Sequence, residues 1–291
     1  MKILISGQHG QVSRELQTHL KGLGELVVLG REQLDLADPA QIRHQVQSIR
    51  PHLIINAAAH TAVDQAESEP DLAFAINATA PQVFAEQAQE LGIPLIHYST
   101  DYVFDGSKNA PYTEADAPNP LSVYGRSKRA GEQAISAVAG QHLILRTSWV
   151  YSTHGRNFLL TMQRLLQEKP HLRIVADQIG APTWAATIAR STAQLIERWQ
   201  AGRAGPWGVY HLSAGGETSW FGFAQAIAAH LQAMGRPCAS LEPIPTRDYP
   251  TPATRPLNSR LDCSHLQQQW GVSQPDWRSA LHECLAGQHW A

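Results

Sequence analysis

The sequence predicts an α/β fold in which a doubly wound parallel sheet is joined to a smaller, mostly C-terminal α/β domain. Residues 2–6 have the composition of a short buried strand, and a glycine turn and a helical segment follow them directly. Strand and helix patterns alternate five times up to residue 150, which favours parallel strands joined by right-handed crossovers. The periodicity then changes. We therefore expect one domain over 1–150 and a second over 151–291.

Composition and charge exclude several classes of protein. The 291 residues are 43% hydrophobic and carry a formal net charge of -2, which gives no electrostatic reason to expect nucleic acid or a membrane as a partner. No apolar run approaches the roughly 20 residues of a membrane helix, and Met1-Lys2 leads into a strand rather than a signal peptide. A cytoplasmic location is therefore expected. Three cysteines without C-x-x-C spacing indicate neither a zinc site nor a disulfide framework.

The glycine turn after the first strand has the spacing G-x-x-G-x-x-S, from Gly7 through Gly10 to Ser13. Gly7 permits a tight turn, and Gly10 lets the backbone approach a phosphate at the start of the following helix. Rossmann-type folds bind the pyrophosphate of a dinucleotide at this place, although a plain strand-to-helix turn is the alternative. Ser13 stands where a third glycine would allow close packing of helix on sheet, and we expect a side chain this small to be tolerated.

The second strand, over 26–29, is followed by an arginine where an acidic residue would favour NAD. Because the Arg31 guanidinium suits a ribose 2′-phosphate, the sequence favours NADPH. NADH stays open as an alternative, since Arg31 could instead be a solvated loop charge. Asp35 and Leu36 could border the adenine.

Small and hydroxylated residues follow the third and fourth strands. The third strand, over 53–56, ends in Ala57-Ala58-Ala59, where a cofactor could lie against the backbone, although close packing alone would also explain them. The fourth strand, over 95–99, is followed by Thr100, whose hydroxyl could hydrogen-bond a substrate carbonyl; the alternative is an ordinary polar strand end. Asn77 faces inward on the helical pattern and could satisfy backbone groups.

A tyrosine and a lysine lie four residues apart, at Tyr124 and Lys128, on a predicted helix that Ser122 can cap. Residues with this spacing share one face of a helix. A nearby ammonium favours the phenolate, so the pair is a candidate proton donor for the reduction of a carbonyl. Taken alone, such a pair is more often two solvated surface residues. The glycine turn and Thr100 favour the catalytic interpretation.

The second half of the chain contributes two more predicted strands, near 172–176 and 208–212, which we expect to join the first sheet. The character of a separate substrate-binding domain is strongest over 214–291. Thr218-Ser219 can cap a helix over 220–234.

Several arginines and one tryptophan of this half are candidates for substrate contacts. In the proline-rich segment 243–260, Arg247, Arg255 and Arg260 could hold a diphosphate, although any single arginine is more often solvated. Trp149, after the fifth strand, could offer an apolar face to a sugar.

Motifs along essentially the whole chain resemble the extended short-chain dehydrogenase/reductase superfamily and, within it, the dTDP-4-dehydrorhamnose reductase family. The segments that carry the resemblance are Asn56–Asp64, Glu67–Pro70, Ser99–Gly106, Tyr124–Lys128, Arg146–Tyr151, Asp177–Thr183 and Arg255–Leu261. The resemblance implies NADPH-dependent reduction of the 4-keto group of dTDP-4-dehydro-β-L-rhamnose to dTDP-β-L-rhamnose. That product is a precursor of cell-surface polysaccharide such as the O-antigen of lipopolysaccharide.

The resemblance also implies roles for individual residues. Thr100, Tyr124 and Lys128 become the expected catalytic set, with Lys128 lowering the pKa of the tyrosine and holding the nicotinamide ribose. Thr100, Asp101 and Trp149 become expected sugar contacts, and Arg255 and Arg260 gain support as diphosphate contacts. Together with Gly7 and Arg31, the expected cofactor contacts are Gly10, Gln11, Val12, Asp35, Leu36, Ala57, Ala58, Ala59, Tyr124 and Lys128.

Two features depart from the family's pattern or leave it open. Ser13 replaces the usual third glycine. Some relatives use a magnesium ion at a dimer interface. The sequence shows no complete carboxylate cluster, although Glu15 could contribute, so no metal residues are assigned. A homodimer is a further expectation.

Two other functions stay open from the sequence. The chain could reduce a different dTDP-4-keto-6-deoxysugar, or it could be a non-catalytic regulatory subunit that binds NADP.

Overall fold

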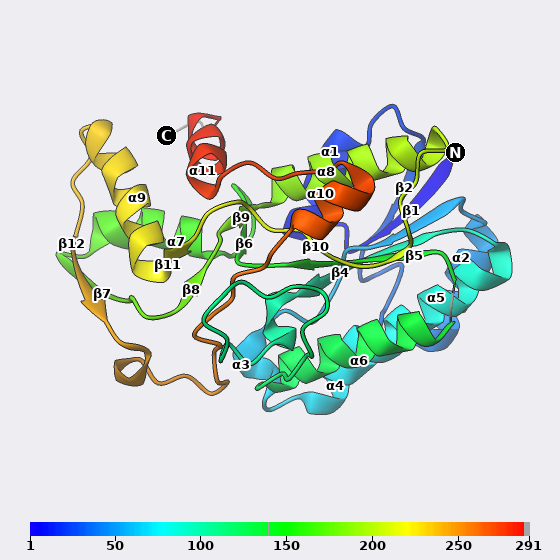
Figure 1. The fold of residues 1–291 in the computed structure, drawn as a ribbon, viewed down its shortest axis with the longest axis horizontal. Helices are drawn as coiled ribbons and strands as arrows, with labels where there is room; N and C mark the ends of the chain where they lie inside the picture. The colour runs from blue at the N-terminus through cyan, green and yellow to red at the C-terminus, as the bar shows by residue number, and fades with distance from the viewer. Residues whose placement is uncertain (139, 288–291) are drawn as a thin grey trace.

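The computed structural model describes residues 1–138 and 140–287, and within them one sheet of six parallel strands forms the centre of the molecule (Figure 1). The strands follow the order β10-β5-β4-β3-β1-β2. Their bounds are β1 (Lys2–Ser6), β2 (Glu25–Leu29), β3 (Leu53–Asn56), β4 (Leu95–Thr100), β5 (His142–Thr147) and β10 (Gly208–His211). The Rossmann-type parallel sheet predicted from the sequence is therefore confirmed.

Helices cover both faces of this sheet. On one face lie α1 (Gln11–His19), α8 (Ala185–Gln200) and α10 (Ser264–Trp270), and on the other lie α2 (Pro39–Ile49), α5 (Ala80–Leu91) and α6 (Val123–Val138) (Figure 1). The connection from β3 to α5 contains α3 (Val63–Ala66), α4 (Pro70–Phe74) and the π-helical turn η1 (Ala75–Thr79). Because both faces are covered, the inner strands β1, β3, β4 and β5 are almost entirely buried and carry much of the apolar core.

Local sequence signals explain where the main helices begin. The Asp38 side chain accepts hydrogen bonds from the backbone N–H groups of Ala40 and Gln41 at the start of α2. The Ser122 Oγ accepts from the Gly125 N–H at a distance of 3.1 Å, so this serine caps α6. The cap at Ser122 agrees with the expectation from the sequence.

The strand order places a topological switch point at the carboxyl ends of β1 and β3. The chain leaves β1 for β2 on one side and then crosses back over β1 to build β3 on the other side. Ligands of open α/β sheets bind where the order reverses in this way. The glycine turn after β1 and the alanines after β3 both lie at this switch point.

A second hydrophobic core lies between the C-terminal helices α7 (Phe158–Glu168), α9 (Trp220–Ala233) and α11 (Trp277–Ala286). Its largest buried side chains are those of Tyr151, Phe223 and Trp277. Ser219 caps α9 by accepting from the Gly222 N–H. Short strands and one turn complete this half: β6 (Val150–Tyr151), β7 (His171–Val175), β8 (Ile179–Gly180), β9 (Thr183–Trp184), β11 (Thr218–Ser219), β12 (Ser240–Ile244) and η3 (Thr246–Asp248). A further turn, η2 (Asp101–Val103), follows β4 in the first half.

The expectation that the strand near 172–176 joins the central sheet is wrong. The strand exists as β7, but it pairs in parallel with β12 in a separate two-stranded sheet. Leu172 and Ile174 pack into the second core rather than into the first. The edge of the central sheet next to β5 is taken by β10, and the proline-rich segment 243–260 contributes the end of β12.

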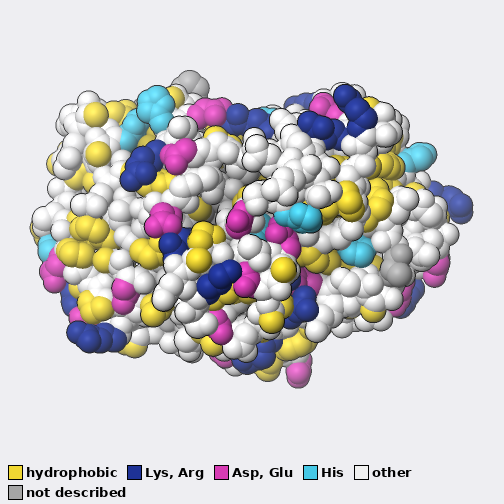
Figure 2. All heavy atoms as spheres, viewed as in Figure 1, with side chains coloured by type: hydrophobic (Ala, Val, Ile, Leu, Met, Phe, Trp, Pro, Cys, Tyr) yellow, Lys and Arg dark blue, Asp and Glu magenta, His cyan; other side chains and the backbone are white. Residues whose placement is uncertain are grey.

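On the face of the described residues that Figure 2 shows, no large area of one charge is seen. Figure 2 shows Lys and Arg side chains interspersed with Asp and Glu on the face in view, in keeping with a net charge of -2. Over the described part of the chain, no helix combines the length and the hydrophobicity that crossing a bilayer requires.

A buried ion pair fixes α6 against the sheet. The Glu132 carboxylate, on α6, is 0% exposed and accepts hydrogen bonds from Arg146 Nε and Nη2 on β5, both at 2.8 Å. The Ser99 hydroxyl donates to the same carboxylate at 2.6 Å.

Glu132→Gln is expected to destabilise the fold by about 3–5 kcal/mol, because the buried Arg146 cation loses its counter-charge. The control is Glu168→Gln, whose partner Arg164 and own side chain are both about half exposed; this change should cost less than about 0.5 kcal/mol. Urea unfolding of both variants measures the difference, and equal costs would contradict this role of the buried pair.

Candidate active site

Tyr124 and Thr100 meet at the carboxyl edge of the sheet. Thr100 is the last residue of β4, and Tyr124 lies in the first turn of α6, where the two side chains interact. The ring of Tyr102 packs edge-on against the Tyr124 ring with 5.6 Å between centroids. A Cβ at Gly125 would lie 2.3 Å from the Tyr102 carbonyl oxygen, so only glycine lets α6 approach this closely. The glycine within the Tyr-x-x-x-Lys motif therefore brings the phenol to the strand end.

The Tyr124 phenol is held in its protonated form. Burial raises its pKa to about 12, and the interaction with Thr100 offsets only part of that rise. Burial dominates the pKa of the phenol in this structure, so the expected effect of the Lys128 ammonium on Tyr124 stays a prediction. A protonated phenol beside a substrate oxygen is suited to donate a proton.

Lys128 is fully buried one turn further along α6, with 1% of its surface exposed. Its Nζ lies 2.7 Å from the Tyr98 carbonyl oxygen, to which it donates, and 3.1 Å from Nε2 of His97. Burial lowers the pKa of Lys128 to about 8, against a smaller opposite effect from Glu132. The charge of this lysine is therefore open to change near neutral pH.

Thr100 is engaged by its neighbour Asp101. The Thr100 hydroxyl donates to Asp101 Oδ1 at 3.0 Å and accepts from the Tyr102 N–H at 3.2 Å. Asp101 is 2% exposed, and burial raises its pKa to about 6. Before Thr100 can donate to a substrate oxygen, its hydroxyl hydrogen has to turn away from Asp101.

The glycine turn has the features of a phosphate site. Gly7 has a φ of +84°, and a Cβ there would lie 2.8 Å from that of Ala58, so the turn packs directly on the chain after β3. Gly10 precedes α1 without any side-chain cap. Since the first N–H groups of a helix have no partner within it, this end of α1 suits a pyrophosphate. Gln11 is oriented by Asn157, whose Nδ2 donates to its Oε1 at 2.8 Å.

The other predicted cofactor residues occupy varied surroundings. Arg31 is exposed just beyond the end of β2, and Asp35 Oδ1 accepts from the Ala37 N–H at 3.0 Å. Leu36 is buried in the core beneath α2 and α5, while Val12 and Ala57 pack against the core on the α1 side. Ser13 is wholly buried, so the position of the third glycine does accommodate a serine.

Two of the predicted substrate residues are already paired with carboxylates. Both Nη atoms of Arg255 donate to the Asp64 carboxylate, at 2.9 and 2.8 Å. Arg260 Nη1 donates to Glu217 at 2.9 Å. Arg247, by contrast, is largely exposed.

Trp149 has an unusual backbone and an unpredicted partner. Its φ is +48°, and its ring stacks on that of Trp220 with 3.6 Å between centroids. A Cβ at Gly180 would lie 2.7 Å from the same ring. One face of the Trp149 ring is therefore covered by Trp220, which the sequence did not single out.

Asn77, expected to satisfy backbone groups, does so: it accepts from the His60 N–H at 2.8 Å and donates to the His60 carbonyl at 3.1 Å. His97 and Asn56 were not predicted as site residues. Each is a polar residue within a buried apolar strand, and this is the signal that could have found them.

Among residues 1–138 and 140–287, no group of three or more His, Cys, Asp or Glu side chains could hold a metal ion. Glu15 instead lies 3.8 Å from His19 and 3.7 Å from His154.

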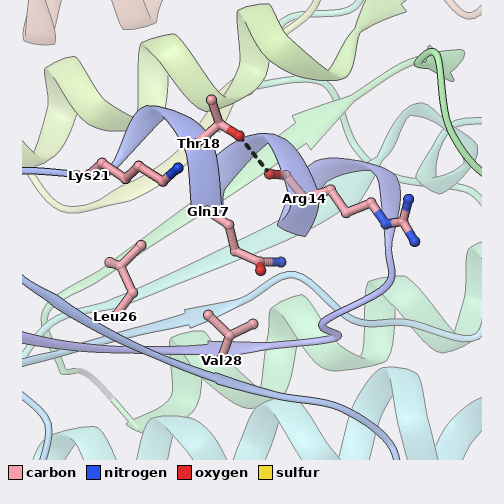
Figure 3. Close-up of a pocket in the computed structure, with 6 residues that line it drawn as sticks. All are labelled: Arg14, Gln17, Thr18, Lys21, Leu26 and Val28. Carbon is pink, nitrogen blue, oxygen red and sulfur yellow. Dashed lines mark hydrogen bonds between the residues drawn. The ribbon is translucent and has the colours of Figure 1, made fainter.

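A separate hollow lies on the outer side of α1, away from the predicted catalytic residues. Figure 3 shows its lining side chains, which come from α1, β2 and the residues between them: Arg14, Gln17, Thr18, Lys21, Leu26 and Val28. The Thr18 hydroxyl donates to the Arg14 carbonyl at 3.4 Å, so part of its polar lining is internally satisfied.

A parallel sheet with a glycine turn at its switch point, and a Tyr–Lys pair on the helix beside that point, define a Rossmann-type oxidoreductase of the short-chain dehydrogenase/reductase class. The chain belongs to the family described as the RmlD substrate binding domain, whose model matches residues 1–289. Membership of the family that the motifs resembled is thereby confirmed.

Relatives of known name agree with this assignment. The chain is 45% identical to the dTDP-4-dehydrorhamnose reductase of Escherichia coli K12 in an alignment that covers 98% of this chain and 97% of that protein. It is also 45% identical to the enzyme of the same name from Burkholderia thailandensis, over 98% of each chain. Among solved structures, the dTDP-4-dehydrorhamnose reductase of Bacillus anthracis in complex with NADP superposes with a TM-score of 0.91. That structure is 35% identical to this chain, and the match covers 99% of both.

Gly7→Ala is expected to destabilise the protein more than Gly22→Ala does. Both glycines have positive φ values, +84° and +94°, so each alanine costs about 1–2 kcal/mol of backbone strain. At Gly22 nothing lies within 4 Å of the new Cβ, whereas at Gly7 it meets Ala58, which adds about 1–3 kcal/mol. Urea unfolding of the two variants gives the comparison, and a smaller loss at Gly7 would show that the turn does not pack as described.

Proposed function

We propose that this chain is an NADPH-dependent reductase that converts the 4-keto group of dTDP-4-dehydro-β-L-rhamnose into the 4-hydroxyl of dTDP-β-L-rhamnose. The observation that carries the proposal is the meeting of Thr100, Tyr124 and Lys128 at the carboxyl edge of the sheet, next to the glycine turn. Relatives that are 45% identical over nearly the whole chain bear the name of this activity.

The residues present fit a bound dinucleotide. The uncapped start of α1 and the turn at Gly7 would hold its pyrophosphate, and Lys128 would hold the nicotinamide ribose. The exposed Arg31 would face a 2′-phosphate, which supports NADPH over NADH. When bound, NADPH supplies the hydride that reduces C4 of the sugar.

The protein supplies the proton and the orientation. Tyr124, protonated at neutral pH, donates its phenolic proton to the C4 oxygen as negative charge develops there, and a phenolate remains. A Lys128 ammonium one turn away stabilises that phenolate. Thr100, once its hydroxyl turns from Asp101, donates to the same substrate oxygen and fixes its position.

On the substrate side, Trp149 and Asp101 would contact the sugar. Arg255 and Arg260 would hold the diphosphate. Each guanidinium must then be shared with, or released by, its present carboxylate partner, which is Asp64 for Arg255 and Glu217 for Arg260.

Purified protein incubated with NADPH and a panel of dTDP-4-keto-6-deoxysugars tests the proposal through the rate of NADPH oxidation. We expect dTDP-4-dehydro-β-L-rhamnose to be turned over fastest. Faster turnover of another 4-keto sugar would show that this other sugar is the substrate. No turnover of any sugar, with NADPH still bound, would indicate a non-catalytic regulatory subunit instead.

Tyr124→Phe should lose roughly 10² to 10⁴ in turnover, because the proton donor is removed while the ring and its packing stay. Binding of NADPH, followed by its fluorescence, should change little. Tyr249→Phe is the matched control, since Tyr249 is 59% exposed and follows η3 rather than lying on α6 or β4, and its turnover should equal that of the unaltered protein. A Tyr124→Phe variant with near-normal turnover would remove Tyr124 from the mechanism.

A cytoplasmic location and a homodimer stay predictions from the sequence. Light scattering of the purified protein would measure the oligomeric state directly.

A further inference from the structure

A chain of four buried polar side chains links the catalytic lysine to the turn where the dinucleotide would bind. Lys128 Nζ lies 3.1 Å from His97 Nε2, and His97 Nδ1 lies 3.1 Å from Asn56 Nδ2. Ser6 Oγ then donates to Asn56 Oδ1 at 2.7 Å. At its far end, Ser6 Oγ accepts from the backbone N–H groups of Ala57 and Ala58, at 3.1 and 3.2 Å.

The register of the sheet builds this chain. Ser6 on β1 is the register partner of Asn56 on β3, and Asn56 is the register partner of His97 on β4. Each of the four side chains is 1% exposed, among strands that are otherwise apolar. Burying polar groups in such strands costs free energy unless every one of them is hydrogen-bonded, and here each has a partner.

The hydrogen bonds of the chain can run in only one direction. Ser6 Oγ accepts two backbone N–H groups, which use both of its lone pairs, so its own hydrogen must go to Asn56. Asn56 therefore presents its oxygen to Ser6 and its NH₂ group to His97. His97 Nδ1 must then accept, and in a neutral imidazole the ring proton lies on Nε2. Burial and the nearby Lys128 hold the pKa of His97 well below its usual value, which keeps the ring neutral.

The Nε2–H group of His97 consequently points at Lys128 Nζ. An ammonium has no lone pair, so two donors would face each other at 3.1 Å, whereas a neutral amine can accept this hydrogen bond. We propose that Ser6, Asn56 and His97 are positioning residues that hold Lys128 Nζ in place and favour its neutral amine form. This inference rests on the proposed function, since the role of Lys128 comes from it.

The other groups around Lys128 do not reverse this preference. On its own helix, Tyr124 is neutral, and the negative charge of Glu132, which favours the ammonium, is shared with Arg146 of β5 and Arg129. From β4, the Tyr98 carbonyl accepts from either form of the amine.

Two carboxylates lie on neighbouring segments. Asp101 of η2 acts on Tyr124, and Glu67 accepts from the Val123 N–H at the start of α6. Burial lowers the pKa of Lys128 to about 8, in the same direction as the hydrogen-bond chain.

The chain is not a path for protons from solvent, because its far end consists of two backbone N–H groups. Its effect is to set the pH at which Lys128 becomes charged. Since the ammonium stabilises the phenolate that remains after Tyr124 has given up its proton, turnover should fall as the pH rises through the pKa of Lys128.

Asn56→Asp reverses the direction of the chain with almost no change in shape. A carboxylate only accepts, so one oxygen would take the hydrogen of Ser6 and the other would take a proton from His97 Nδ1. His97 Nε2 would then have a lone pair for a Lys128 ammonium. We expect the pKa of Lys128 to rise by about one unit or more, and the alkaline fall of turnover to move by the same amount.

NMR titration of protein labelled with ¹³C at the lysine side chains measures the pKa of Lys128 without any need for activity. The chain has five lysines, and the Lys128→Met variant identifies the signal that belongs to Lys128. The second variant is His97→Gln, whose amide oxygen can accept from an ammonium; it should also raise the pKa of Lys128. The matched control is His142→Gln, which alters a partly buried histidine at the amino end of β5, away from the carboxyl edge of the sheet. This change should leave the pKa of Lys128 unchanged.

A Lys128 that titrates at the same pH in the unaltered protein, in Asn56→Asp and in His97→Gln would overturn the proposal. If Asn56→Asp loses its fold, its unfolding midpoint will be lowered. The pKa of Lys128 in His97→Gln would then decide whether the proposal holds. Absence of sugar turnover would contradict the proposed function alone, because the titration follows the lysine itself.

Discussion

The parallel register of β1, β3 and β4 is the constraint on which the site depends. It brings the ends of three strands to one edge, so that the glycine turn after β1, the alanines after β3 and Thr100 after β4 become neighbours. The same register aligns Ser6, Asn56 and His97 beneath that edge. A slip of one residue in either pairing would turn these side chains to the opposite face and separate the lysine from the turn.

Burial then decides the chemistry of the side chains that meet there. It raises the pKa of Tyr124 to about 12 and lowers that of Lys128 to about 8. The tyrosine therefore carries its proton at neutral pH, as the role proposed for it requires, and the lysine is a group whose charge the surroundings can set. A low-dielectric edge of a sheet and a closed hydrogen-bond chain act together, and neither is visible in the spacing of Tyr124 and Lys128 alone.

Local patterns predicted the part of this structure that local forces determine. The strand–glycine–helix start, the cap at Ser122 and the Tyr–Lys spacing are all contained in a few neighbouring residues. Contacts between distant segments were missed. The pairing of β7 with β12, the stacking of Trp149 on Trp220, and the ion pair of Arg255 with Asp64 each depend on how the whole chain packs. The hydrogen bond of His97 to Lys128 required the register of three strands.

The most direct test of the central claim follows the hydride. The protein is incubated with NADPH that carries deuterium at the transferred position and with dTDP-4-dehydro-β-L-rhamnose, and the product is examined by NMR. Deuterium at C4 of a sugar with the L-rhamno configuration is the predicted result. Deuterium at another carbon, or a product with the opposite configuration at C4, would contradict the account.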